Sequence, residues 1–357
     1  MRRVAVVIAL ALLLAACDSR PAPNGTSVTS PDPGAPAFTI LWAGDTLLAD
    51  GAQPLLDANG YDWPFALLAG ELTADFTLVN LEGPITTDGA PWDPGQRWTY
   101  NAQPSAALAL AAAGVDAVSL ANNHALDRGP HGIADTRDTL AMAGIAVFGA
   151  GLDGEAKQPL LIETPHGIVA VVGFGPDKGF GRTASTHRPG WLLPSATAVG
   201  RGIALARAGG ARWVVAFVHW GENYAPVDEH QRRAAQRFAD AGYDLVIGHG
   251  PHLAQPIALI PTDSGGSMPV IYSLGNFVFG TPGRYGPDAT GVSLLLRTII
   301  DEGGIHAELR CLLTDNQDIA FQPRLCPSTQ ARSVLRAVHA GIELEEDVGI
   351  LRWGSLR

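Results

Sequence analysis

The chain has 357 residues, of which 46% are hydrophobic and 17% are charged, and its formal net charge is −11. This composition supplies enough apolar side chains for a large core. The acidic balance argues against a nucleic-acid-binding protein, because a phosphate backbone requires a basic surface. The three cysteines have no C-x-x-C spacing, which argues against a thiolate zinc site.

Residues 1–17 resemble a lipoprotein signal peptide. A cationic start precedes an apolar run over residues 4–16, which is too short to span a bilayer but typical of a signal-peptide core. Leu14 to Cys17 resembles a lipobox, in which a peptidase cuts before the cysteine and its thiol is acylated. We therefore expect an exported protein, lipid-anchored to a membrane of the cell envelope through Cys17 and facing outside the cytoplasm. An ordinary secretory signal with a chance cysteine is the alternative.

Residues 18–37 are rich in Pro, Ser and Gly, which predicts a flexible tether between the anchor and the domain. Residues 38–357 are expected to form one domain, since no further linker divides them. An exported chain folds where disulfides persist, so Cys311 and Cys326 could pair. Two separate buried thiols are the alternative.

Apolar strands and amphipathic helices alternate through the first two thirds of the domain. Strands are predicted at 38–43, 76–81, 115–120, 145–148, 168–172, 213–219 and 245–248, and helices at 105–113, 132–143, 196–208 and 228–241. This rhythm predicts βαβ units and a largely parallel sheet. Strands at 270–273, 278–279, 291–300 and 306–313 are expected to form a second sheet packed on the first. A helix at 328–340 closes the domain, and the last residues are expected to be peripheral.

Polar side chains follow many of these strands directly. In α/β sheets, ligands bind beyond the carboxyl ends of the strands. The residues at those ends are Asp45, Glu82, Asn123, His124, His219, His249 and His252. Any one of them alone would be explained as a helix cap or a turn residue. Together they predict a ligand site.

The chemistry of this set is that of a metal site. Imidazole, carboxylate and amide oxygen suit divalent ions such as Zn²⁺, Mn²⁺ and Fe²⁺. The set is large enough for one or two ions, and in a two-metal site Glu82 could bridge them. His124 would then be free to act as a general acid.

Several longer strings resemble one protein family. They are Gly44-Asp45, NLEGPI at 80–85, LANNHALD at 120–127, HWG at 219–221, GHGPH at 248–252 and YSLGNFVF at 272–279. In this order they are similar to the CapA (PgsA) family, associated with synthesis and export of poly-γ-glutamate capsule. The resemblance implies a calcineurin-like metallophosphoesterase fold, a two-sheet αββα sandwich. It also implies metal ligation by Asp45, Glu82, Asn123, His219, His249 and His252, with His124 as the catalytic acid.

The resemblance is incomplete at two points. A phosphoesterase has a histidine two residues after the first aspartate, and here that residue is Leu47. The closing histidines are also spaced by two residues, not one. A single metal, or a binding site without hydrolysis, therefore remains open beside a dinuclear centre.

Two functions follow as expectations. The first is a metal-dependent hydrolase acting on an anionic polymer or another cell-envelope substrate. The second is a polymer-binding scaffold that works with capsule synthesis and export proteins of the membrane. An acidic chain would need local cations to hold an anionic polymer. The candidates are Arg128, Arg137, Lys178, Arg182, Arg188 and Arg284.

Some neighbouring residues have less specific patterns. Trp92, Trp98 and Tyr100 lie in a Pro/Gly loop and could contact polymer or cover a sheet edge. Asp127 is expected to cap a turn into the next helix. Asn276 could line the pocket or shape the backbone.

Overall fold

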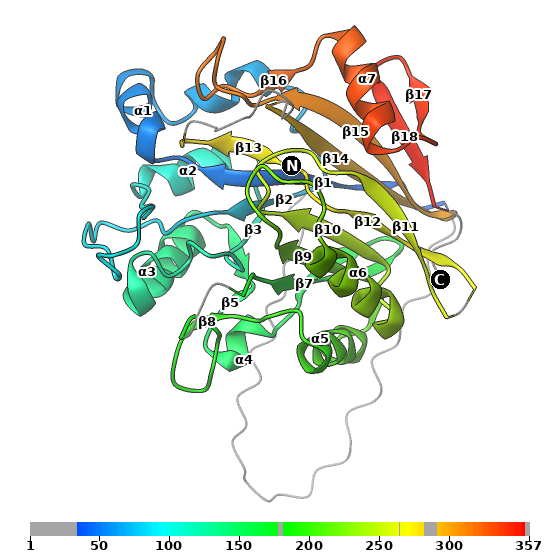
Figure 1. Ribbon diagram of the computed structural model, residues 1–357, viewed down its shortest axis with the longest axis horizontal. Helices are drawn as coiled ribbons and strands as arrows, with labels where there is room; N and C mark the ends of the chain where they lie inside the picture. The colour runs from blue at the N-terminus through cyan, green and yellow to red at the C-terminus, as the bar shows by residue number, and fades with distance from the viewer. Residues whose placement is uncertain (1–33, 178–180, 264, 282–290, 354–357) are drawn as a thin grey trace, which may run out of the picture.

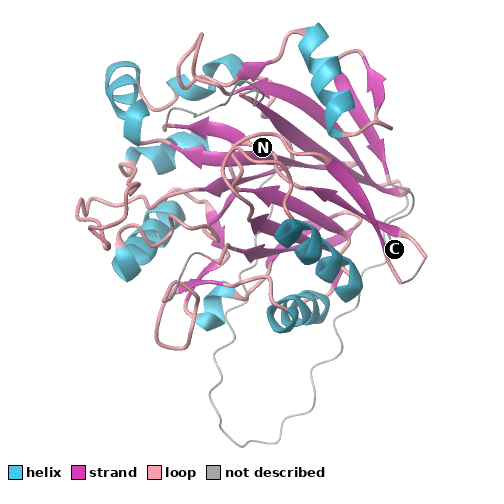
Figure 2. Ribbon diagram, viewed as in Figure 1, coloured by secondary structure: helices cyan, strands magenta, loops and turns pink. Residues whose placement is uncertain are grey.

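The computed structural model describes residues 34–177, 181–263, 265–281 and 291–353 (Figure 1). Two β-sheets pack face to face, with helices on the outside (Figure 2). The predicted α/β class and the two-sheet αββα sandwich are confirmed. Residues 1–33, which include Cys17 and most of the expected tether, lie outside the described residues.

The larger sheet has ten strands in the order β17-β18-β15-β14-β1-β2-β3-β4, with β13 beside β1 and β16 beside β15. Its strands are β1 (Phe38–Leu47), β2 (Phe76–Leu81), β3 (Ala117–Ser119), β4 (Ala146–Phe148), β13 (Asn276–Phe279), β14 (Val292–Asp301), β15 (Gly304–Leu313), β16 (Arg324–Leu325), β17 (Glu343–Glu345) and β18 (Val348–Arg352). Strands β1 to β4 run parallel to one another, and β14 pairs antiparallel with β1.

The smaller sheet has six strands in the order β11-β12-β10-β9-β7-β6. Its strands are β6 (Leu160–Thr164), β7 (Gly167–Phe174), β9 (Ala211–His219), β10 (Leu245–His249), β11 (Ile257–Pro261) and β12 (Ser267–Ile271). Its four central strands are parallel, and both edge strands are antiparallel to their neighbours. Two short strands, β5 (Ala150–Gly151) and β8 (Gly190–Trp191), pair separately.

Most of the helices cover the outer faces of this sandwich. They are α1 (Gln53–Asn59), α2 (Ser105–Ala112), α3 (Gly129–Met142), α4 (Asp153–Ala156), α5 (Ala196–Ala208), α6 (Glu229–Ala241) and α7 (Ser328–Val338), with 3₁₀ helices at Asp50–Ala52 and Trp63–Leu68. Apolar side chains of α1, α2 and α3 pack on the larger sheet, and those of α5 and α6 on the smaller one. In the described part of the chain, no helix combines the length and apolar character needed to cross a bilayer.

Two predictions about the arrangement of strands are wrong. Strands β13, β14 and β15 do not form a second sheet, because they extend the sheet that β1 to β4 begin. Their pairing joins residues far apart in the chain, such as Phe38 with Ile300, and the local alternation of apolar and polar residues does not reveal such pairs. The last residues are not peripheral either. Strand β18 pairs with β15, and Leu351 and Trp353 are only 3% and 8% exposed.

A register irregularity in β1 turns Asp45 toward the second sheet. Ile40 and Trp42 point between the two sheets, whereas Leu41 and Ala43 point toward the outer helices. Regular alternation would place Asp45 on the outer face with Ala43. The pairing with β2 shifts register between Trp42 and Asp45, and the carboxyl group then lies between the sheets.

Glycine is required immediately before this aspartate. A Cβ on Gly44 would lie 1.9 Å from the carbonyl oxygen of Gly275. The same carbonyl accepts a hydrogen bond of 2.9 Å from the Asp45 amide. The Gly-Asp pair therefore lets β1 approach the turn before β13 closely enough to fix the position of Asp45.

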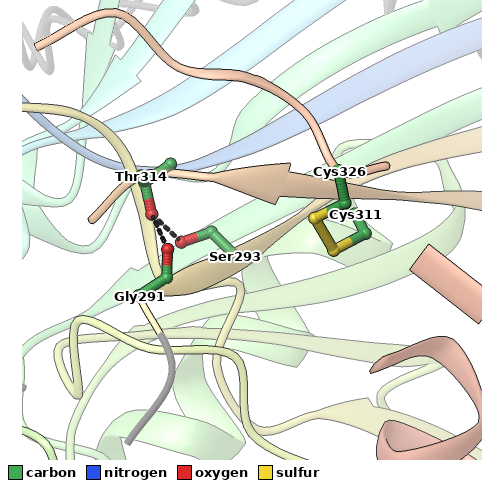
Figure 3. The surroundings of a disulfide bond; sticks show 5 residues. All are labelled: Gly291, Ser293, Cys311, Thr314 and Cys326. Atoms are coloured by element: carbon green, nitrogen blue, oxygen red, sulfur yellow. Dashed lines mark hydrogen bonds between the residues drawn. A yellow bond between two sulfur atoms is a disulfide. The ribbon is translucent and has the colours of Figure 1, made fainter. Parts of the chain in front are cut away.

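A disulfide joins Cys311 on β15 to Cys326, which follows β16 (Figure 3). The Cys326 amide also donates a 2.9 Å hydrogen bond to the Cys311 carbonyl. Nearby, the hydroxyl groups of Ser293 and Thr314 lie 2.7 Å apart and link β14 to the end of β15. These contacts secure the half of the larger sheet that lies beyond β1.

Candidate metal centre

Three buried side chains meet where strands of both sheets end. Asp45 lies in β1, Glu82 directly follows β2, and His252 follows β10. One potential ligand atom from each lies within 4.8 Å of the others, and the residues are 0%, 1% and 5% exposed. Because Asp45 and Glu82 lie in or directly after strands of the larger sheet and His252 follows a strand of the smaller one, the cluster lies at the junction of the two sheets.

Histidine nitrogens surround one oxygen of Glu82. The Nε2 atoms of His219 and His252 lie 3.8 Å from Glu82 Oε1, and that of His124 lies 3.9 Å from it. These separations are too long for hydrogen bonds. For His252, whose Nε2 is grouped with Asp45 and Glu82, the separation suits two ligands of one ion, which at about 2.1 Å each lie up to about 4.2 Å apart. The donor set and its spacing therefore fit a divalent metal such as Zn²⁺, Mn²⁺ or Fe²⁺.

The orientation of His252 leaves a nitrogen available to a metal. Its Nδ1 lies 2.9 Å from Asn276 Oδ1 and 3.3 Å from Asp45 Oδ2, and both oxygens are acceptors. Nδ1 therefore carries the proton, and the lone pair of Nε2 faces Glu82. His252 also has a φ of 60°, a left-handed conformation that is uncommon for a residue with a side chain. The local backbone is thus bent to bring the ring into the cluster.

The side chain of Asn122 is fixed by backbone groups on both sides. Its Oδ1 accepts a hydrogen bond of 3.1 Å from the His124 amide. Its Nδ2 donates to the Leu81 carbonyl at 2.7 Å and to Asn80 Oδ1 at 3.1 Å. Because Asn122 presents its amino group, Asn80 must present its oxygen to Asn122 and its own amino group to the cluster.

Asn80 then donates to two members of the predicted site. Its Nδ2 lies 2.7 Å from Asp45 Oδ1 and 3.1 Å from His219 Nδ1. His219 Nδ1 is therefore an acceptor, so the proton of the neutral ring lies on Nε2. Burial lowers the pKa of His219 to about 3, which keeps the ring neutral near pH 7. Sequence reasoning missed Asn80, although it shares a strand face with Glu82 two residues later.

Asp45 is held as a carboxylate. Burial raises its pKa, but the hydrogen bond from His252 and the charges of His252, His219 and His249 outweigh this effect. The net pKa of Asp45 is well below its ordinary value. The Gly250 amide adds a 3.1 Å hydrogen bond to Asp45 Oδ2. A charged, well-oriented carboxylate is the form that a metal requires.

Asp127 orients the predicted catalytic acid. It does not cap the next helix, so the prediction of a capping role is wrong. Its Oδ2 lies 2.7 Å from Nδ1 of His124, and it accepts a further 2.7 Å hydrogen bond from the Tyr100 amide. The centroids of the Tyr100 and His124 rings are 4.2 Å apart. His124 is therefore held on two sides, with Nε2 directed toward Glu82.

A cavity of about 280 Å³ opens beside His124 and His252. Asn123 lines it next to them, and Trp98, Tyr100, Tyr224 and Phe279 provide aromatic walls. Trp98 and Tyr100 thus border the candidate centre. The cavity gives a ligand access to His124, whose ring the Asp127 carboxylate orients.

A family model described as bacterial capsule synthesis protein PGA_cap matches residues 39–281. The chain belongs to this family. The chain is 28% identical over 246 residues to the PGA biosynthesis protein CapA of Bacillus subtilis (strain 168), covering 68% of this chain and 63% of that protein. It is 32% identical over 316 residues to a probable polyglutamine synthesis accessory protein of Mycobacterium tuberculosis (strain ATCC 25618 / H37Rv), covering 74% of this chain and 80% of that protein.

Two solved structures share a weaker likeness with this PGA_cap chain. The NAD nucleotidase of Haemophilus influenzae aligns with a TM-score of 0.47 at 11% identity, covering 87% of this chain and 57% of that one. A 5'-nucleotidase precursor from Thermus thermophilus aligns with a TM-score of 0.47 at 13% identity, covering 85% and 58%. At these scores neither likeness supports a conclusion about this PGA_cap chain.

The structure does not bring every predicted ligand of the PGA_cap site into the cluster. Among the described residues, the cluster of ligand atoms excludes His249. Its Nε2 lies 3.3 Å from the Ala43 carbonyl oxygen, and its ring centroid is 4.1 Å from that of Phe217. Leu47 is buried in the core under the outer helices. Ligation by Asn123, His219 and His249 stays a prediction.

Only some of the cationic residues predicted to bind polymer line the cavity in the described part of the chain. Of the predicted candidates, Arg182 lines it. Lys178 and Arg284 lie outside the described residues, and the lining does not include Arg128, Arg137 or Arg188. Arg97 also lines the cavity. Sequence reasoning missed it, because an exposed residue in an irregular loop carries no periodic signal.

Proposed function

We propose that this PGA_cap protein is a metal-dependent hydrolase acting on an anionic polymer or another cell-envelope substrate during capsule synthesis or export. One arrangement supports the proposal most directly. His124, oriented by Asp127, borders an open cavity beside the buried cluster of Asp45, Glu82 and His252. A proton donor next to metal-type ligands is the combination that hydrolysis of an ester or amide requires.

Asp45, Glu82 and His252 would hold the ion, with His219 beside them. The ion would supply Lewis-acid chemistry to the bond that is cleaved. Asn80 holds the Asp45 carboxylate, and Asn276 fixes the ring of His252. Such supporting hydrogen bonds typically change metal affinity or activity by about 10- to 100-fold.

His124 would protonate the leaving group. The hydrogen bond between His124 Nδ1 and Asp127 leaves Nε2 as the atom that faces the centre. When the ring carries two protons, Nε2 can give one to the departing oxygen or nitrogen, and the ring becomes neutral. A positioned general acid of this kind contributes about 10²- to 10⁴-fold to a rate.

One observation favours a second candidate, a polymer-binding subunit without catalysis. Leu47 is 1% exposed and stands where the resemblance implies a first-motif histidine. A dinuclear centre of the phosphoesterase kind would therefore lack one ligand. In this case the cavity would hold polymer for the membrane proteins of a capsule synthesis and export complex.

We also propose that the protein is exported and anchored to a membrane through lipid on Cys17. The apolar run and lipobox-like residues before Cys17 support this. The disulfide between Cys311 and Cys326 suits an oxidising compartment. Membrane proteins of capsule synthesis and export would be the partners at that location.

The test compares hydrolysis with and without metal. The purified full chain is stripped with a chelator, restored with Mn²⁺ or Zn²⁺, and assayed on a p-nitrophenyl phosphodiester and a γ-glutamyl p-nitroanilide. Metal-dependent cleavage of either substrate should be lost in His124→Ala and kept in His131→Ala, which alters an exposed histidine. Absence of cleavage by the metal-loaded wild type would favour the binding subunit.

A further inference from the structure

We propose that Arg97 and Arg182 form a subsite that binds an acidic group of the substrate, a carboxylate or a phosphate, in the cavity beside His124. The inference rests on the proposed function only in placing the substrate in this cavity. It adds the residues that recognise the acidic group of that substrate.

The lining of the cavity differs in charge from the whole chain. The chain has a net charge of −11, yet the described lining contains Arg97 and Arg182 and no aspartate or glutamate. The carboxylates of Asp45 and Glu82 lie behind it and are 0% and 1% exposed. A ligand that enters the cavity therefore meets cationic side chains in an otherwise acidic protein, which favours an anionic ligand.

Arg182 is held in place by its neighbours. Its Nη2 donates a 2.8 Å hydrogen bond to Gln96 Oε1 and lies 3.7 Å from Asp93 Oδ2. Its guanidinium carbon is 6.0 Å from the ring centroid of Trp92. The Arg182 side chain is 16% exposed, whereas that of Asp93 is 54% exposed. Solvent therefore screens the charge of Asp93. In the described part of the chain these contacts involve one Arg182 nitrogen, so other N–H groups of its fork can receive a ligand.

Arg97 provides the second cation. Its guanidinium carbon lies 5.2 Å from the ring centroid of Trp98, and both residues line the cavity. Among the described residues, no carboxylate forms an ion pair with Arg97. A planar guanidinium stacked on an indole keeps its edge available for oxygen atoms. Two guanidinium groups that line the same cavity suit the paired oxygens of a carboxylate or a phosphate.

A chain of hydrogen bonds connects this subsite to the proposed catalytic acid. Arg182 donates to Gln96 Oε1, and Gln96 Nε2 donates to Asp127 Oδ1 at 2.7 Å. Asp127 Oδ2 in turn lies 2.7 Å from His124 Nδ1. Gln96 therefore fixes the guanidinium relative to the imidazole. An acidic group bound at Arg182 would place the neighbouring bond of the substrate at a set distance from His124.

The cavity is small for a polymer. Its volume of about 280 Å³ lies just below that of typical ligand pockets, which span about 300–1,000 Å³. One acidic unit of a longer chain fits such a space, and the remainder would extend outside. We therefore expect affinity to depend on the charge of a single unit and to change little with polymer length.

The experiment measures binding and does not require turnover. Isothermal titration calorimetry on the chelator-treated full chain compares a γ-linked glutamate tetramer, the same tetramer with its free carboxylates converted to amides, and inorganic phosphate. We expect the charged tetramer or phosphate to bind the wild type at least about 10-fold more tightly than the amide form. Arg182→Gln and Arg97→Gln should each weaken that binding about 10-fold, as expected for loss of one charged hydrogen-bonded pair.

Arg336→Gln is the matched control, because it removes one positive charge from an exposed position on α7. It should bind like the wild type. Phosphate affinity that depends on the two arginines, without tetramer binding, would assign the subsite to phosphate. Three results would each overturn the proposal. The first is equal affinity for the charged and amide tetramers together with phosphate binding that does not depend on the two arginines. The others are unchanged affinity in both cavity variants and no binding of either anion.

The outcome is separable from that of the hydrolase proposal. Arginine-dependent binding without metal-dependent cleavage would remove the hydrolase and keep the subsite. Cleavage that continues with arginine-independent binding would remove the subsite and keep the hydrolase. Unchanged thermal melting of each variant shows that the fold is retained.

Discussion

Oδ2 of Asp127 lies 2.7 Å from Nδ1 of His124, three residues earlier in the chain. The two residues lie in a turn before α3, where the Asp127 amide also donates a 3.0 Å hydrogen bond to the His124 carbonyl. The short LANNHALD segment thus contains both an imidazole and the carboxylate that orients it. This local pair gives the centre a defined proton on the ring nitrogen that faces away from Glu82.

Asp127→Asn should reduce hydrolysis by the metal-loaded protein about 10²-fold or more, while metal affinity stays unchanged. An amide can offer its amino group to His124 Nδ1, which would move the ring proton to Nε2 in the neutral form. Nitrogen NMR of the labelled imidazole would show the change of tautomer. Asp138→Asn, at an exposed position on α3, is the control. A wild-type rate in Asp127→Asn would contradict the orienting role.

Asp45→Ala and His252→Ala should each weaken binding of Mn²⁺ or Zn²⁺ by about 10²-fold or more. Each removes one member of the buried cluster, and a site with few ligands depends on each of them. Titration calorimetry of the chelator-treated protein measures the affinity. His230→Ala alters an exposed histidine on α6 and should bind metal like the wild type. Equal affinity in His252→Ala and His230→Ala would place the metal elsewhere.

The metal-free protein should lose stability as the pH falls from about 7 toward 4. Burial lowers the pKa of His219 from 6.5 to about 3, and burial also lowers the pKa of His249. Between pH 6.5 and 3 the unfolded chain therefore binds protons that the folded chain does not. Stability is full above the unfolded pKa and falls through this window. The depressed pKa of Asp45 acts in the same direction below about 3.8.

Urea midpoints measured at each pH test this directly. One unit of pKa difference corresponds to about 1.4 kcal/mol of unfolding free energy at full effect. His249→Gln removes one buried imidazole and should give a shallower decline than the wild type. Midpoints that stay constant from pH 7 to 4 would refute the prediction.

Removing the disulfide should lower the free energy of unfolding by about 3 kcal/mol, because the unfolded chain loses a cross-link that closes a loop. The bonded cysteines are 15 residues apart. Urea denaturation of Cys311→Ser with Cys326→Ser, against the wild type with and without reductant, measures the effect. The double variant should not respond to reductant. Equal midpoints for the oxidised wild type and the double variant would show that the bond adds no stability.

Much of the fold was accessible from sequence because its central strands and helices carry strong local patterns. The helix at Ala196–Ala208 and the strand at Phe76–Leu81 begin and end where the sequence predicts. The assignment of strands to sheets was not accessible, because the pairing of β14 with β1 joins segments far apart in the chain. The polar strand ends were accessible for a similar reason, since parallel strands end at a common edge.

The arrangement of side chains within the site was harder to predict than the identity of its residues. Nothing in local sequence shows that β1 shifts register before Asp45. The identity of the hydrogen-bond partners was also hidden, since Asn80 and Asp127 act through side-chain geometry that spacing does not determine. His249 belongs to the same motif as His252, yet the turn at Gly250 sends the two rings to different surroundings.

The residues of the cluster come from both sheets, so the distances between their ligand atoms depend on how the two sheets are aligned. A core substitution that slides one sheet by a fraction of an ångström would alter the gap between Glu82 and His252. Trp42 and Phe217, whose rings lie 6.3 Å apart between the sheets, are such positions. Titration of variants at these two positions with Mn²⁺ or Zn²⁺ would then show weakened metal affinity, although neither side chain is a member of the cluster.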